Sequence, residues 1–319
     1  MNQSRFRMSK IALGLLVALA AAPSFAQSTS AGVGGQVVGS DGNPVAGAEV
    51  TITHTESGTV SRATTDESGR YNARGLRVGG PYTISVVKAG AGTDTEENIY
   101  LALNQTSTVN ATLAGGDVAT LETVTAVGFS GGSEVFSATK MGSGTSIDQV
   151  AIESLPSIGG NIQDFMRLDP RVAFVDRASG TISAGGQNPR YNSISIDGVS
   201  ASDTFGLEGN NMTTRRQPVS MDAIEAIDIK LSGYEVSTPS ASGATVNAVT
   251  KSGTNEFHGS FYGSYRDGDW FGDNPEGQPF NGFTEEKTYG VTIGGPIVKD
   301  KLFFFANYEK FEQAAPGFD

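Results

Sequence analysis

The sequence predicts a mainly β protein with three parts: a small β-sandwich, an α+β domain, and the first strands of an incomplete antiparallel transmembrane β-barrel. Gly accounts for 42 of 319 residues, and hydrophobic residues for 38%. This composition suits short strands and turns better than packed helices. Turn signals recur at spacings of about 8–12 residues between Gly32 and Leu113, as in β-sandwiches. From Glu256 to Tyr265 the residues alternate strictly, the period of a transmembrane strand of about 9–11 residues.

Residues 1–26 have the organisation of a secretory signal peptide. A cationic start contains Arg5, Arg7 and Lys10, and an apolar run follows from Ile11 to Ala22. Small residues then occupy the positions that a signal peptidase recognises, so we expect cleavage before Gln27. The apolar run is too short to cross a bilayer as a helix, which takes about 20 residues.

The negative net charge of the chain and its scarcity of Cys and His argue against several classes of function. The formal net charge is −12, and removal of the basic first segment makes it more negative. We therefore expect no nucleic-acid partner, because such binding needs basic patches. With no Cys and only two His, we expect neither a metal site nor a cofactor. No later segment is apolar for long enough to form a transmembrane helix, so a membrane form would have to be a β-barrel.

Residues 32–114 are predicted to form the sandwich. Expected strands include Glu49 to Thr55, Thr59 to Thr65 and Tyr82 to Val87, separated by turns such as Asp41-Gly42-Asn43-Pro44. Alternation along these strands selects the residues expected to point inward: Val50, Ile52, Tyr71, Leu76, Tyr82, Ile84 and Val86.

Three stretches, GQVVGSDGNPVAGAEVTI, TTDESGRYNARGL and GGPYTISVVKAG, resemble the carboxypeptidase regulatory-like domain. The resemblance implies a carbohydrate-binding-like sandwich that serves as a scaffold and not as a peptidase. His54-Thr55-Glu56 lacks the spacing of a zinc peptidase site, and His258 lies far along the chain. We expect His54 to be a surface histidine on a strand.

Residues 115–134 are small, polar and flanked by Gly, which predicts a linker. Within it, Leu121 to Val127 form a β-prone heptad. By itself the heptad is compatible with a short strand. The heptad also resembles a TonB box, an extended peptide that a partner captures by β-strand addition. Its position in the linker before the next domain favours this second interpretation. The resemblance implies TonB contacts at Glu122, Thr123, Val124, Thr125, Ala126 and Val127.

Residues 135–254 combine one clear helix with several strands. The helix is expected over Asn161–Leu168, with Ile162, Phe165 and Met166 on its apolar side. Tyr191 to Ile196 alternates and ends in Asp197-Gly198, a hairpin signal. Further on, Ile227, Ile229 and Leu231 alternate with Asp228 and Lys230, which predicts a half-buried strand, and Thr245–Thr250 forms another.

The ordered segments IESLP, NIQDFMRLDPRV, PRYNSISIDGV, MDAIEAIDIKL and SGATVNAVTKSGTNEFHGS resemble the plug of TonB-dependent outer-membrane receptors. The similarity is to the Oar-like receptors that carry a carboxypeptidase regulatory-like domain in front. Two turns depart from the family pattern. Many such plugs have an adjacent Arg-Gly pair, whereas here the glycines and the arginine are separated over Gly185 to Arg190. The Gly-Pro that follows the Ile-Glu strand in the family is replaced here by Ser232-Gly233-Tyr234.

Residues 255–319 are predicted to begin the barrel, joined to the plug by a periplasmic turn over 250–255. Later strands are expected at Thr288–Ile293 and Leu302–Lys310. The connections are unequal, a long loop over 266–287 and a short turn over 294–301. Outer-membrane barrels have long extracellular loops and short periplasmic turns, so the first strand should run outward. A buried soluble strand at Phe303–Phe305 is the alternative. GGPIVKDKLFFFANYEK also resembles the first barrel hairpin of these receptors.

These resemblances imply an outer-membrane receptor with its plug and N-terminal domain on the periplasmic side. Its partners would be the C-terminal domain of TonB with its inner-membrane energising complex, the lipid of the outer membrane, and an unknown extracellular ligand. The resemblance implies a barrel of about 22 strands, and the three strands predicted here cannot close one. We therefore expect the N-terminal part of a longer receptor or a truncated reading frame.

Two other functions can be weighed against energy-coupled uptake. An Oar-like surface protein that acts in adhesion or signalling without uptake is the alternative, and dependence on TonB distinguishes the two. An enzyme is not expected, because the sequence lacks a Gly-x-Ser-x-Gly elbow, a His-x-x-Glu site and a phosphate-binding Gly-Lys-Ser/Thr loop. The acidic pairs Glu96-Glu97 and Glu285-Glu286 are expected in solvated loops.

Overall fold

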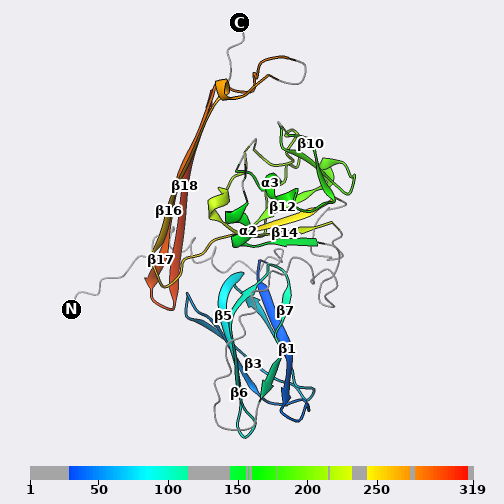
Figure 1. Cartoon of the computed structure of the whole chain (residues 1–319), viewed down its shortest axis with the longest axis vertical. Helices are drawn as coiled ribbons and strands as arrows, with labels where there is room; N and C mark the ends of the chain where they lie inside the picture. The colour runs from blue at the N-terminus through cyan, green and yellow to red at the C-terminus, as the bar shows by residue number, and fades with distance from the viewer. Residues whose placement is uncertain are drawn as a thin grey trace, which may run out of the picture.

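The computed structural model describes residues 29–113, 144–155, 157, 160–177, 179–214, 216–231, 243–273 and 277–314. They form a β-sandwich (29–113), an α+β domain that we call the plug (144–250), and a long three-stranded sheet (258–314) beside the plug (Figure 1). The expected signal peptide, the heptad 121–127 and the 232–234 turn lie outside the described residues. Within the described residues, no helix is long and apolar enough to cross a membrane.

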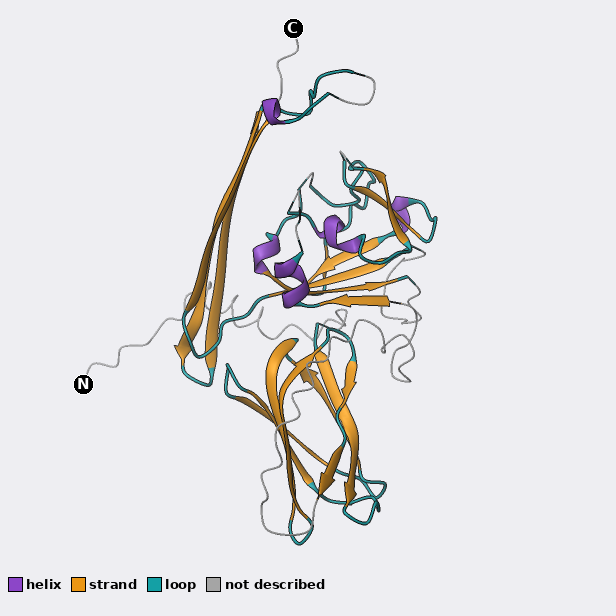
Figure 2. Ribbon diagram, in the orientation of Figure 1, coloured by secondary structure: helices purple, strands orange, loops and turns teal. Residues whose placement is uncertain are grey.

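The sandwich consists of two four-stranded sheets packed on one core (Figure 2). One sheet contains β4 (Arg70–Leu76), β1 (Ala31–Gly39), β7 (Thr106–Thr108) and β8 (Ala111–Leu113). The other has the order β3 (Thr59–Thr64), β2 (Glu49–His54), β5 (Gly79–Lys88) and β6 (Gly92–Leu101). All seven side chains expected to point inward are buried. Alternation along the strands therefore predicted this core correctly.

The expectation that His54 lies on the surface is wrong. Its side chain is 3% exposed, its ring contacts the Tyr82 ring edge-on at 4.8 Å, and its Nδ1 lies 2.9 Å from Ser57 Oγ. Burial, with a smaller contribution from the charge of Arg77, lowers the pKa of His54 to about 4. The reason is register: His54 shares the inward face of β2 with Val50 and Ile52.

The plug is built on one five-stranded sheet. Its order is β13 (Val199–Ser200), β12 (Ser193–Ile196), β15 (Thr245–Thr250), β14 (Ile224–Lys230) and β9 (Gly144–Ile147). A separate hairpin and two short helices complete it: β10 (Val172–Asp176), β11 (Thr181–Ala184), α2 (Gln149–Ser154) and α3 (Ile162–Met166). Single 3₁₀ turns are η2 (Pro189–Tyr191) and η3 (Met221–Ala223). Asp197 and Gly198 both have positive φ, 49° and 78°, which confirms the predicted hairpin turn.

Two features of the plug differ from expectation. The helix α2, capped by Asp148, was missed because its six residues bury only Ile152 and carry no visible period. Strand β14 was expected to be half-buried, yet Asp228 is 3% exposed. The sandwich covers the face of β14 that carries Asp228, and Asn104 Nδ2 donates to Asp228 Oδ2 at 3.4 Å. The alternation of polar and apolar residues along one strand does not reveal that a second domain buries its polar face.

The third unit is an open antiparallel sheet in the order β16, β17, β18. Its strands are β16 (His258–Asp267), β17 (Glu285–Val298) and β18 (Leu302–Ala314), with the 3₁₀ turn η4 (Gly268–Trp270) after the first. Strands β17 and β18 are longer than expected, whereas β16 has the expected ten residues but lies two positions later, because pairing continues as far as Asp267 and Glu285. The prediction of solvated loops at Glu96-Glu97 and Glu285-Glu286 is wrong, because these pairs lie in strands β6 and β17.

Candidate functional site

The sheet β16–β18 has an inverted distribution of polarity. Tyr289, Val291 and Ile293 on one face of β17 are 40–49% exposed, whereas Thr288 and Thr292 on the other are at most 9% exposed. Cross-strand pairing extends the exposed apolar face, here called the outer face, to Phe261 and Tyr308. A soluble sheet buries its apolar face, so the inversion is that of a strand with lipid outside and polar groups inside.

Aromatic side chains cluster towards both ends of this sheet. Tyr265 and Trp270 meet edge-on at 5.4 Å near the 268–284 loop, and Phe257 lies 6.2 Å from Phe304 near the short turn. Aromatic girdles of this kind flank the lipid-facing band of outer-membrane barrels. The loop and the sandwich lie at opposite ends of the sheet (Figure 1).

The polar inner face of the sheet contacts the plug through a set of five residues that we call the plug–barrel contact: Arg216, Ser220, Tyr262, Asn307 and Glu309. Arg216 Nη2 donates to Glu309 Oε1 at 2.9 Å. The Tyr262 hydroxyl lies 2.7 Å from Ser220 Oγ and 3.0 Å from Glu309 Oε2, and Asn307 Nδ2 donates to it at 3.3 Å. Both strands and the plug thus share one hydrogen-bonded network.

The ion pair in this network is mostly shielded from water. The side chains of Arg216 and Glu309 are 24% and 18% exposed, and the Arg216 guanidinium also lies 4.2 Å from the centre of the Phe311 ring. Charge-assisted hydrogen bonds with little solvent around them are stronger than surface pairs. The contact therefore fixes where the plug sits against β16 and β18.

A second polar cluster secures β9, the strand that begins the described part of the plug. Thr145 Oγ1 donates to Asp169 Oδ2 at 2.9 Å, and Arg171 Nε donates to Asp169 Oδ1 at 2.8 Å. Burial raises the pKa of the Asp169 carboxyl, but the hydrogen bonds from Arg171 and Thr145 outweigh it and lower the pKa overall. Among the described strands β9 pairs with β14 alone, so the Thr145 hydrogen bond adds a side-chain anchor to the one that buried Ile147 supplies.

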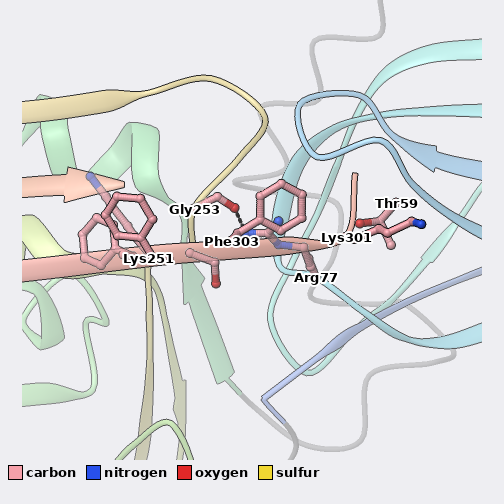
Figure 3. A pocket seen from close by; sticks show the side chains of 9 residues that line it. Thr59, Arg77, Lys251, Gly253, Lys301 and Phe303 are labelled. Carbon is pink, nitrogen blue, oxygen red and sulfur yellow. Dashed lines mark hydrogen bonds between the residues drawn. The ribbon is translucent and has the colours of Figure 1, made fainter. Parts of the chain in front are cut away.

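A third cluster joins the sandwich, the segment 251–257 and the β17–β18 turn. Arg77 Nη2 donates to the Gly253 carbonyl at 3.1 Å (Figure 3), and the Asn255 amide donates to the Glu56 carbonyl at 2.9 Å. Arg77, Lys251 and Lys301 line a cleft of about 520 Å³ together with Phe303 and its two neighbours, Phe304 and Phe305. The cleft thus combines cationic groups with aromatic rings.

Catalytic and metal chemistry find little support among the described residues. Ser57 and His54 are in hydrogen-bond contact, as in a nucleophile and base pair, but Ser57 is fully buried and the pair stabilises the β2–β3 turn. Across the described part of the chain, no group of three or more His, Cys, Asp or Glu is placed to hold a metal ion. His258, the other histidine, is exposed on β16.

The predicted TonB-binding residues 122–127 lie outside the described residues. The strands that flank them are described: β8 ends at Leu113 and β9 begins at Gly144. Sequence reasoning missed Arg216, Ser220 and Asp169 as site residues. For Tyr262 and Glu309 a signal was present, because both fall on the polar faces of alternating strands.

Comparisons with known proteins match each end of the chain to a family. Residues 32–114 match the carboxypeptidase regulatory-like domain, and residues 249–318 match an outer membrane beta barrel domain. The TonB-dependent transporter Oar of Myxococcus xanthus is 30% identical over 311 residues, which is 93% of this chain and 28% of that protein.

Two further similarities concern Acinetobacter baumannii. Its probable TonB-dependent siderophore receptor PirA is 30% identical over 184 residues, 50% of this chain and 22% of that protein. The crystal structure of the siderophore receptor PirA aligns with a TM-score of 0.41 at 24% identity, covering 53% of this chain and 24% of that one. The chain thus spans 28% and 22% of the lengths of these two curated relatives.

Proposed function

Because this chain belongs to the Oar-like TonB-dependent outer-membrane receptors, with a carboxypeptidase regulatory-like domain in front, we propose that it forms the energy-coupled front end of a transporter. In this proposal the sandwich and plug lie on the periplasmic side, and TonB drives a rearrangement of the plug. The observation that carries the proposal is the similarity to the transporter Oar over 93% of the chain.

The arrangement of the domains supports this proposal. The plug lies against the polar face of β16–β18, while the apolar face is left exposed for lipid. The long loop and the sandwich lie at opposite ends of the sheet, which accords with an extracellular loop and a periplasmic sandwich (Figure 1).

The proposed mechanism rests on the position of residues 122–127 in the linker before the plug. TonB would add them as a strand, so main-chain hydrogen bonds would carry the load. Force on the linker reaches the described part of the plug first at Gly144, where β9 begins. Strand β9 has only four paired residues, Gly144 to Ile147, and it is at the edge of the sheet. It is therefore the element that a pull would detach with the fewest broken bonds.

The test is capture of the protein by the C-terminal domain of TonB. Val124→Pro removes a ladder donor from the heptad and should abolish capture without affecting folding, which the protease resistance of the sandwich and plug would report. Val118→Pro, in the same linker but outside the heptad, is the matched control and should be captured normally. Equal capture of both variants would refute the assignment of the heptad and favour a role in adhesion or signalling without uptake.

A further inference from the structure

One end of the sandwich packs on the plug sheet. Ala226 of β14, only 2% exposed, belongs to the same buried cluster as Val78, Leu101 and Leu103 of the sandwich, and Val249 of β15 packs against that cluster. The opposite face of the plug sheet, with Ile227 and Ile229, packs on the plug's own core. The sheet is therefore buried on both sides, and the sandwich supplies one of them.

The same end of the sandwich binds the segment that leaves the plug. Arg77 Nη2 donates to the Gly253 carbonyl at 3.1 Å, and its guanidinium lies 6.0 Å from the centre of the Phe303 ring in β18. The Asn255 amide donates to the Glu56 carbonyl at 2.9 Å. Figure 3 shows Arg77 close to both Gly253 and Phe303, so one side chain interacts with both the segment 251–257 and the barrel strand.

The periplasmic turn between β17 and β18 completes this contact. Asn255 Nδ2 donates to Asp300 Oδ1 at 2.7 Å, and the Asp300 amide donates to Asn255 Oδ1 at 2.8 Å. A β-carbon at Gly58 would lie 2.5 Å from Asp300 Oδ1, and Gly58 has a φ of +65°. Both the close approach and the left-handed backbone require glycine at the tip of the β2–β3 turn.

We propose that the sandwich is a clamp that fixes one corner of the plug to the first barrel hairpin. Its partner is intramolecular: the face of β14 and β15 that carries Ala226 and Val249, together with the segment 251–257 and the turn at Asp300. The clamp holds the end of the plug that adjoins the barrel and leaves β9 at the sheet edge outside these contacts. Plug movement is then confined to elements away from the clamp. This role concerns how the chain holds itself together and does not depend on TonB.

The contact can be trapped with a disulfide, because the chain has no cysteine of its own. Glu56→Cys with Asn255→Cys joins two residues whose backbones are hydrogen-bonded, within reach of a disulfide. In the purified full chain, oxidation should link this pair in most molecules, seen as a mobility shift that reductant reverses. Thr53→Cys with Val60→Cys, paired across β2 and β3, is the positive control. Glu67→Cys with Asn255→Cys, with Glu67 in a turn at the far end of the sandwich, is the negative control.

A second measurement leaves Asn255 unaltered. Arg77→Ala should speed hydrogen exchange of the backbone amides over 251–257 about tenfold, because a charge-assisted hydrogen bond and a ring contact are lost. Arg74→Ala, an exposed arginine on β4, should leave exchange unchanged. The clamp is supported by selective 56–255 linkage together with faster exchange in Arg77→Ala. It is overturned if the 56–255 pair links no better than the 67–255 pair, or if exchange is the same in both arginine variants.

Discussion

Thr145 Oγ1 donates a hydrogen bond to Asp169 Oδ2 at 2.9 Å, and Asp169 has no exposed surface. This bond ties the first described strand of the plug to the segment that follows α3. Because β9 begins at Gly144, a pull on the linker that detached β9 would have to break this bond. Asp169 and its donors therefore set how firmly the edge strand is held.

The Asp169 anchor should weaken in acid. The pKa of Asp169 is lower in the folded plug than in the unfolded chain, so its stabilisation is complete above the unfolded value of about 3.9. Stabilisation is lost as the pH falls below that value and through the folded pKa. Exchange of the β9 amides should accelerate steeply over this range.

Asp169→Asn tests this explanation. It should loosen β9 at neutral pH, at a cost of about 1–3 kcal/mol, and flatten the acid dependence of exchange. Thr145→Val removes one donor and should keep most of the acid dependence, because Arg171 still binds the carboxylate. An unchanged pH profile in Asp169→Asn would mean that another group controls the strand.

The ion pair of Arg216 with Glu309 should couple the plug to the barrel strands. Arg216→Ala and Glu309→Ala should each increase hydrogen exchange around η3, and the double variant should be less affected than the sum of the two. We expect a coupling free energy of about 1 kcal/mol or more, since the pair is mostly shielded from water. Strictly additive effects would show that the two side chains act separately.

Trp270 should report the outer boundary of the membrane. It is the single tryptophan of the chain and 68% exposed, and it contacts Tyr265 at the end of β16. Tryptophan prefers the interface between lipid and water. In proteoliposomes, lipids brominated near the headgroup should quench its fluorescence more than lipids brominated at the chain ends. The reverse order would place the loop end of the sheet inside the bilayer.

The sequence predicted most of the fold because period-2 alternation carries the inward face of each strand. That pattern identified the core residues from Val50 to Val86 and the two faces of β16–β18. It failed where a neighbouring unit decides burial: Asp228 has a polar pattern but lies beneath the sandwich. It also gave no sign that Asp169 bonds to Thr145 or Arg216 to Glu309, because the two residues of each pair are distant in sequence and follow no spacing rule.

The central claim, that TonB moves the plug by pulling on residues 122–127, is tested most directly by thiol labelling of Ile147→Cys in cells. Ile147 is 3% exposed in β9, and Val246 in the clamped strand β15 is fully buried. In energised cells with ligand present, Ile147→Cys should become labelled while Val246→Cys stays protected. Adding Val124→Pro should protect both positions. Labelling of Ile147→Cys that is the same with and without Val124→Pro would contradict the account.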